Sequence, residues 1–185
     1  LGIYEGDKYL SMIIDAADQS DHALPHSATK SHTSDAAWKI KLHLIGVLVH
    51  GRGSYVYTCP PHLAQGNNIT VQALWDTIVK IKTKNGKLPP VLFLQLDNTT
   101  KSCKGRYLMA FLALLVEHNV FKKIVLSFLP VGHTHEDIDQ FFSCISRTLR
   151  FYDAHSRLSL AHCIKRSFRK WGVPPEVTHW TTVAN

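Results

Sequence analysis

The sequence has little of what stabilises a small secreted domain or a zinc-binding module. Its 185 residues include only four cysteines, and none belongs to a C-x-x-C pair or lies near a histidine at zinc-finger spacing. We therefore expect reduced thiols in an intracellular protein. The longest apolar run, at residues 108–116, is too short to cross a bilayer, so we expect no membrane partner.

The chain also lacks an initiator methionine, an internal repeat and a low-complexity tract. Because it begins at Leu1, we expect a fragment of a longer protein. Hydrophobic residues make up 45% of the chain and charged residues 19%, which is a globular composition rather than a disordered one. A length of 185 residues suits one domain with one substantial core, so we expect residues 1–185 to form a single domain.

Acidic residues are few, and the two kinds of charge are unevenly distributed. The net charge is +7, yet residues 1–38 hold six acids and two bases, a balance of −4. Residues 147–170 hold seven bases and one acid, a balance of +6. This basic stretch is either a solvated helix face or a surface for nucleic acid. The candidate nucleic-acid contacts are Arg147, Arg150, Lys165, Arg166, Arg169 and Lys170.

Hydrophobic periodicity predicts a mixed α/β fold. Alternating or wholly apolar runs predict strands over 9–15, 39–50, 54–59, 91–96 and 124–131. Helical periodicity predicts helices over about 68–85, 104–119, 134–149 and 156–171. Three antiparallel strands followed by two crossover strands form a five-stranded mixed sheet flanked by helices, with the crossover strands parallel to the first.

The two last predicted helices are amphipathic. In the helix over 134–149, the expected core stripe consists of Ile138, Phe142, Ile145 and Leu149. In the basic C-terminal helix over 156–171, the apolar side is expected to include Leu158, Ala161, Ile164 and Phe168.

Two acidic residues end predicted strands. Asp15 closes the first strand, and Asp97 closes the strand over 91–96. Ligands of such sheets bind outside the carboxyl ends of the parallel strands, so a pair of carboxylates there favours a bound cation. Asp15 can instead cap a turn, Asp97 can form an Asx turn with the residues after it, and Asp18 competes for the role of the first acid.

A third acid is expected where the helix over 134–149 begins. Thr134 and Asp137 match a capping box, which explains Asp137 structurally. Asp139 lies on the opposite side of the helix, on one edge of the core stripe, and Glu136 lies one turn before it. We therefore favour Asp139, with Glu136 and Asp137 as alternates. His133 either contacts a phosphate or is a structural histidine beside the cap.

Three carboxylates form a ligand set that suits Mg²⁺ or Mn²⁺. Two such ions about 4 Å apart can activate a water or a 3′-hydroxyl and stabilise the leaving oxygen of a phosphodiester. The expected chemistry is therefore DNA cleavage and strand transfer.

Three segments resemble one family. They are IDAADQ at residues 14–19, LQLDN at 94–98 and GHTHEDID at 132–139. Together they resemble an uncharacterised domain family of transposable elements that is related to DDE transposases, whose catalytic core is ribonuclease-H-like, as in retroviral integrase. The resemblance covers nearly the whole chain. It departs from the family at residues 99–106, where relatives often have a richer polar run with a further Asn.

The resemblance implies a metal triad at Asp15, Asp97 and Asp139. It also implies DNA as the partner (transposon ends and a target), a homo-oligomer, and a location in the nucleus, or in the cytoplasm before import. The departure at residues 99–106 keeps open a domesticated core that binds nucleic acid or protein without catalysis.

A zinc hydrolase similar to the metallo-β-lactamases is a further alternative. His133, His135 and Asp137 match the start of its His-x-His-x-Asp pattern. The next position requires a histidine but holds Ile138, and only 46 residues remain downstream for further ligands.

Overall fold

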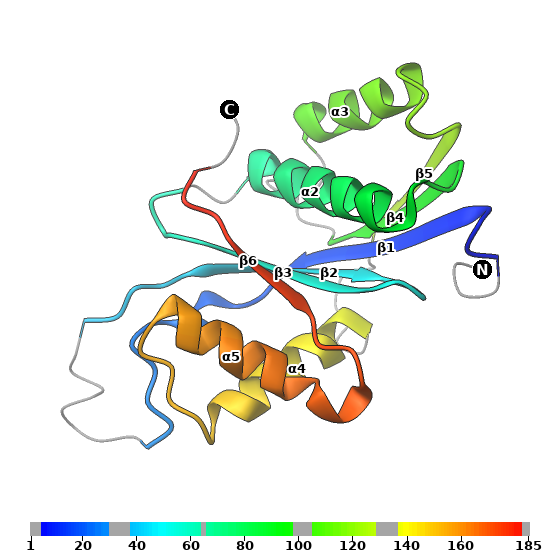
Figure 1. Cartoon of the computed structure of the whole chain (residues 1–185). Helices are drawn as coiled ribbons and strands as arrows, with labels where there is room; N and C mark the ends of the chain where they lie inside the picture. Colours follow the sequence, from blue (N-terminus) through cyan, green and yellow to red (C-terminus); the bar gives the residue numbers. More distant parts are fainter. Residues whose placement is uncertain (1–4, 30–37, 64–65, 98–104, 129–136, 183–185) are drawn as a thin grey trace.

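A six-stranded mixed sheet forms the centre of the protein (Figure 1). The computed structural model describes residues 5–29, 38–63, 66–97, 105–128 and 137–182. The strands are β1 (Tyr9–Ala16), β2 (His43–Val49), β3 (Gly53–Cys59), β4 (Val91–Leu96), β5 (Lys123–Phe128) and β6 (Glu176–His179). Their spatial order is β5-β4-β1-β2-β3-β6.

The strand pairing confirms the predicted sheet and adds one strand to it. β1, β2 and β3 pair antiparallel, while β4 lies parallel to β1 and β5 lies parallel to β4. The prediction of five strands was wrong, because β6 pairs parallel with β3 at the edge of the sheet. β6 has only four residues and follows Pro174 and Pro175, a context that indicated the end of a helix but no strand.

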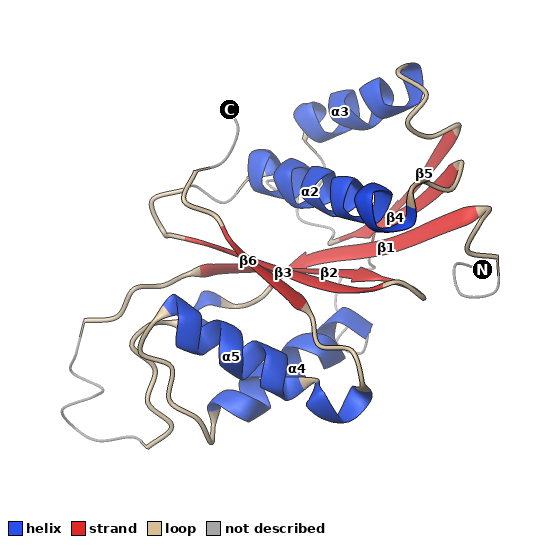
Figure 2. Ribbon diagram, viewed as in Figure 1, coloured by secondary structure: helices blue, strands red, loops and turns tan. Residues whose placement is uncertain are grey.

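Helices cover both faces of the sheet (Figure 2). α2 and α3 lie on one face, and α4 and α5 lie on the other. The helices are α2 (Asn67–Asn85), α3 (Arg106–Glu117), α4 (Asp137–Leu149) and α5 (Arg157–Ser167), with short 3₁₀ turns η1 (Gln19–His22) and η2 (Arg169–Trp171). No helix among the described residues is both long and apolar enough to span a bilayer.

The alternation of side chains along β1 assigns its residues to two separate cores. Leu10, Met12 and Ile14 are buried against the α2 and α3 side. Ile13 is buried against the α4 and α5 side. Because successive side chains of a strand point to opposite faces, Asp15 points toward α4 and α5.

Two predicted helix faces differ from the observed ones. In α4 the buried aromatic residue is Phe141, while Phe142 is only partly buried. In the last helix Leu158 is 72% exposed, because the buried stripe runs through Leu160 and Ile164 on the other side of the helix. The α-helix also ends at Ser167, four residues earlier than predicted.

The edge strand β6 is held by contacts with α2. Lys80 on α2 pairs with Glu176 at 2.7 Å and donates to the Thr178 hydroxyl at 2.6 Å. Just after β6, the Trp180 indole stacks on Tyr57 with ring centroids 4.6 Å apart and donates to Asp76 at 2.9 Å. These contacts attach the end of the described chain to the first core.

Replacing Trp180 should therefore destabilise the fold. Trp180 is only 7% exposed, so Trp180→Ala leaves a cavity and removes the indole hydrogen bond to Asp76. We expect a loss of about 3–5 kcal/mol in the free energy of unfolding, measured by urea denaturation. Trp38→Ala is the control, since Trp38 is 82% exposed and should cost less than about 0.5 kcal/mol. Equal losses in the two variants would contradict the anchoring role of Trp180.

Candidate functional site

Asp15 and Asp97 end neighbouring parallel strands and point to the same face of the sheet. Ile14 of β1 pairs with Leu96, the last residue of β4; Asp15 is the next residue of β1, and Asp97 directly follows β4. Ile14 and Leu96 both belong to the core under α2 and α3, so the following side chains point the opposite way. The topology therefore brings these two predicted acids to one edge, on the side of α4.

α4 brings Asp139 to the same place. Asp15 and Asp139 line a pocket of about 570 Å³ between the end of β1, the segment after it, and one side of α4. Ser143 and Arg150 lie on the same side of α4 and line the pocket further along, and Asp18 lines it from the segment after β1. The pocket is therefore acidic near the strand end and basic toward the end of α4.

A glycine lets α4 lie close to the sheet at this point. Gly46 of β2 pairs directly with Asp15. A Cβ atom at Gly46 would lie 2.8 Å from Cζ of Phe142 and 3.2 Å from Cδ1 of Ile138. A larger residue there would therefore force the Phe142 ring, which packs α4 on the sheet, to move. Phe142 thus packs over the glycine instead of joining the central stripe of α4.

The pKa of Asp15 depends on its burial and on the charges of the other two acids. Burial, followed by the negative charges of Asp97 and Asp139, raises the pKa of Asp15 from 3.8 to about 6. One hydrogen bond opposes this effect, because the backbone amide of Ala16 donates to Asp15 Oδ1 at 2.7 Å. The shift shows that Asp97 and Asp139 lie close enough to repel an ionised Asp15.

Asp137 lies on the other side of α4. Its carboxylate is 3.4 Å from Nε2 of His50, and Nδ1 of His50 is 2.9 Å from the Ser11 hydroxyl. Asp137 also lines a second pocket, which includes neither Asp15 nor Asp139. Among the acids of the predicted set, Asp137 is therefore separated from the pair at the strand end.

Part of the predicted set cannot be placed. His133, His135 and Glu136 lie outside the described residues, so the roles considered for them, including the zinc alternative, stay predictions. Within the described ranges, no three or more His, Cys, Asp or Glu side chains already form a cluster that could enclose a metal ion.

Sequence reasoning missed His22, which lines the acidic pocket and is only 1% exposed. Its Nδ1 lies 3.0 Å from the carbonyl oxygen of Asp18 and donates to it, because a carbonyl can only accept. Such a bond orients the imidazole ring. No motif surrounds His22, and only the fold of η1 brings it beside Asp15.

The basic candidates fall into two groups. Arg147 and Arg150 line the acidic pocket. Lys165, Arg166 and Arg169 line a different pocket on the outer side of α5. The six residues were predicted as one nucleic-acid surface, and the structure divides them between two adjoining regions, with Lys170 exposed on η2.

A protein-family model described as a domain of unknown function, DUF7869, matches residues 32–185. The chain belongs to the DUF7869 family. No curated protein sequence is significantly similar to it. Among solved structures, the chain resembles one titled "Mos1 transposase paired-end complex with left transposon end", with 13% sequence identity and a TM-score of 0.50.

The similarity covers 89% of the DUF7869 chain and 47% of the Mos1 transposase chain, so this chain spans about half the length of that protein. At this level of identity the likeness concerns the fold. The DUF7869 chain has the transposase-like, ribonuclease-H-like fold that the sequence predicts.

The raised pKa of Asp15 predicts how stability depends on pH. Below pH 3.8 the side chain is protonated in both the folded and the unfolded chain, and between 3.8 and about 6 only the unfolded chain ionises. Folding stability contributed by Asp15 is therefore lost as the pH rises to about 6. Asp15→Asn removes this loss and can still accept the hydrogen bond from Ala16. We expect the variant to be more stable than the native chain above pH 6.5, and the difference to vanish near pH 4.

Thermal denaturation across pH 4 to 8 measures this difference. Asp7→Asn is the matched control, because Asp7 is an exposed acid at the start of the chain and only forms a surface ion pair with Lys87. A stability difference for Asp15→Asn that does not change with pH would contradict the proposed burial of its charge.

Proposed function

We propose that this chain carries out metal-dependent cleavage and strand transfer of DNA phosphodiesters, with Asp15, Asp97 and Asp139 as metal ligands. The observation that carries this proposal is the placement of the acids: Asp15 and Asp139 line one pocket at the end of β1, and Asp97 follows the neighbouring parallel strand. Burial first, and then the charges of Asp97 and Asp139, raise the pKa of Asp15. A divalent cation between them would relieve this repulsion.

The donor set fits Mg²⁺ or Mn²⁺. All three side chains offer carboxylate oxygens, which are the ligands that these hard cations prefer, and no thiolate lines the pocket. Asp15 must lose its proton to bind a cation, so affinity for the metal should increase as the pH rises through about 6. When bound, the ions supply Lewis acidity for the attacking and leaving oxygens of a phosphodiester.

The chain's own residues bind and orient the DNA in this proposal. Arg147 and Arg150 line the same pocket as the acids and can pair with the phosphates on either side of the reacting one. His22 lines the same pocket, and the carbonyl of Asp18 orients its ring. The choice of DNA is supported by the similar fold of the Mos1 transposase, whose structure contains a transposon end.

A domesticated core that binds DNA without cutting it is the second candidate. It is favoured by one observation, which is that Lys165, Arg166 and Arg169 line a pocket that excludes the three acids. We also propose that the protein forms a homo-oligomer and acts in the nucleus. These two points follow only from its similarity to transposases.

Mutation of the acids separates the two candidates. Asp97→Asn and Asp139→Asn should each lower the nicking of supercoiled plasmid in Mn²⁺ or Mg²⁺ by at least about 100-fold, because each removes a charge that holds the metal. Asp137→Asn is the matched control on the other side of α4 and should retain activity. Equal nicking by the native chain and both variants, or none by any protein, would refute the catalytic proposal and leave DNA binding.

Metal binding can be tested without any reaction. A ligand that binds only the folded chain raises its stability, so Mg²⁺ or Mn²⁺ should raise the melting temperature of the native chain at pH 7.5. The increase should be smaller at pH 5, where Asp15 is protonated, and absent in Asp15→Asn. An equal increase in the variant would place the bound cation somewhere else.

A further inference from the structure

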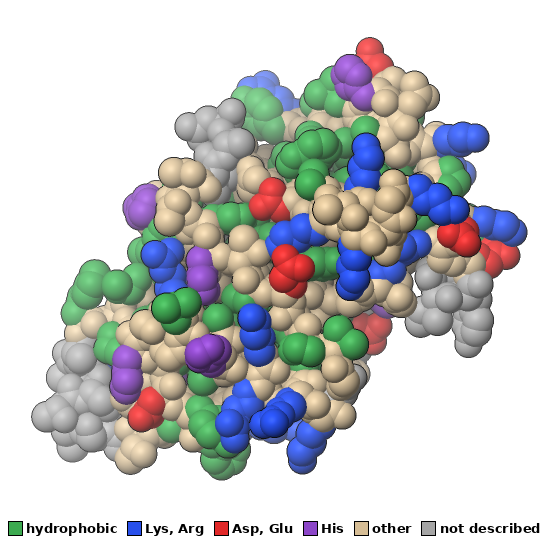
Figure 3. Space-filling view, in the orientation of Figure 1, with side chains coloured by type: hydrophobic (Ala, Val, Ile, Leu, Met, Phe, Trp, Pro, Cys, Tyr) green, Lys and Arg blue, Asp and Glu red, His purple; other side chains and the backbone are tan. Residues whose placement is uncertain are grey.

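The outer side of α5 carries positive charge that the described part of the chain does not neutralise. Lys165, Arg166 and Arg169 form no ion pair with any carboxylate among the described residues. In Figure 3, Lys and Arg side chains gather over the lower end of the molecule, where α5 lies in Figure 1.

These charges surround a concave site. A pocket of about 630 Å³ lies between α5, the turn after η2, and the segment that joins α4 to α5. Its lining includes Lys165 and Arg166 from α5, Arg169 from η2, and Tyr152 from the segment before α5. A site of this size can accept a nucleotide rather than only an inorganic ion.

An aromatic side chain is already oriented in this pocket. The Arg166 guanidinium donates to the Tyr152 hydroxyl at 2.7 Å and lies 4.1 Å from the centre of the Tyr152 ring. Phe151, the preceding residue, is 73% exposed. Aromatic rings beside arginines are the combination that binds unpaired bases together with their phosphates.

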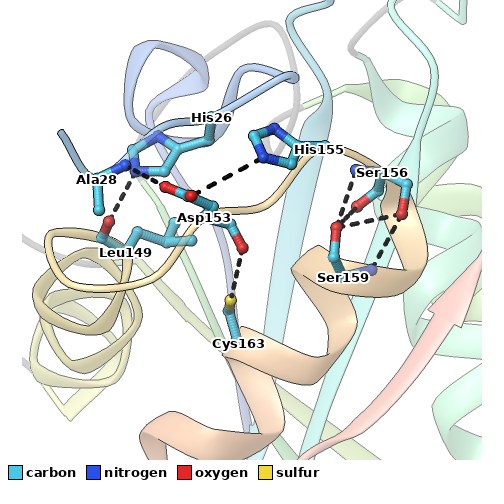
Figure 4. A network of polar contacts seen from close by, with 8 residues as sticks. All are labelled: His26, Ala28, Leu149, Asp153, His155, Ser156, Ser159 and Cys163. Atoms are coloured by element: carbon cyan, nitrogen blue, oxygen red, sulfur yellow. Dashed lines mark hydrogen bonds and ion pairs between the residues drawn. The ribbon is translucent and has the colours of Figure 1, made fainter. Parts of the chain in front are cut away.

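The wall that carries Tyr152 is held in place by a network of polar contacts (Figure 4). His26 donates through Nε2 to the carbonyl of Leu149 at 2.7 Å and exchanges two backbone hydrogen bonds with Ala154. The amide of Ala28 donates to the Asp153 carboxylate at 2.8 Å. Contacts on both sides of Tyr152 therefore fix its position, which reduces the entropy lost on binding a ligand.

Asp153 is the acid that lines this pocket together with these bases, and its carboxylate is engaged elsewhere. One oxygen accepts from Ala28, and the other lies 3.9 Å from Nε2 of His155. The carboxylate thus holds the wall of the pocket rather than pairing with Arg166 or Arg169.

The pocket adjoins the acidic one. Arg150 lines the acidic pocket and Tyr152 lines this one, and their Cα atoms are two residues apart, which is at most about 8 Å. Consecutive phosphates of an extended nucleic-acid strand can therefore pass from Arg147 and Arg150, over the exposed Phe151, to Arg166.

We propose that the pocket around Tyr152, Arg166 and Arg169 binds a single-stranded segment of DNA next to the phosphodiester held at the acids. The choice of DNA rests on the proposed function, while the binding itself needs neither metal nor catalysis. Phosphates pair with the arginines, and an unpaired base stacks on the aromatic residues of the wall.

Fluorescence anisotropy with a labelled 20-nucleotide single strand, in EDTA, tests this site. We expect Arg166→Ala/Arg169→Ala to weaken binding by about tenfold or more and to reduce the slope of log K against log salt by about 0.7 for each lost phosphate contact. Tyr152→Ala should weaken binding by about tenfold, whereas Tyr152→Phe, which keeps the ring, should bind nearly as the native chain does.

Lys122→Ala/Lys123→Ala is the matched charge control, because it removes two exposed lysines at the start of β5, outside both pockets. If a variant in the pocket does not fold, hydrogen exchange of the native chain with and without the strand provides the test. Residues 150–156 and 163–170 should become protected.

Equal weakening by the two double variants, or no protection of these segments, would overturn the proposal. Duplex DNA of the same sequence that binds more tightly than the single strand, with no effect of Tyr152→Ala, would also overturn it. Tighter binding of the RNA strand than of the DNA strand would overturn the choice of DNA. Loss of nicking in Asp97→Asn with unchanged strand binding would support both proposals, and strand binding without any nicking would refute only the catalytic one.

Discussion

The central constraint in this structure is the half-buried carboxylate of Asp15 facing two other carboxylates. Burial, followed by the charges of Asp97 and Asp139, favours its neutral form, so ionisation of Asp15 lowers the stability of the fold. The rest of the architecture maintains this arrangement. β1 and β4 are parallel neighbours, so their ends meet, and Gly46 lets α4 lie close enough to bring Asp139 to them. A cation is the simplest partner for such a set, which is why the proposed function depends on metal.

α4 organises the surface around this site. Its buried stripe is packed on the sheet, and its two flanks carry different chemistry. Asp139, Arg147 and Arg150 lie along the flank that faces the end of β1, whereas Asp137 pairs with His50 on the other. The segment after α4 leads directly to the basic pocket beside α5. One of the three acids, Asp139, and both groups of basic residues therefore come from the same part of the chain.

Much of the candidate site could be predicted, because two of its acids end strands. Strand ends are visible in a sequence as the point where an apolar run stops, and a helical wheel separates Asp137 from Asp139. His22 could not be predicted in this way, since it lies in a short 3₁₀ turn with no motif around it. The division of the basic residues into two groups could not be predicted either. It depends on how α5 packs against α4 and on the contacts that residues 26–28 make with the segment between these helices.

The sequence by itself determined the order of five strands and four helices, since alternation and helical periodicity are local properties of the chain. It also determined which acids stand at strand ends and where the positive charge accumulates. Only the tertiary structure decided that β6 closes the sheet edge, that Phe141 rather than Phe142 occupies the core, and that Leu158 faces solvent. These outcomes depend on which surfaces meet across the sheet, such as Phe142 over Gly46 and Trp180 on Tyr57. Contacts between residues far apart in the chain leave no periodic signal in the sequence.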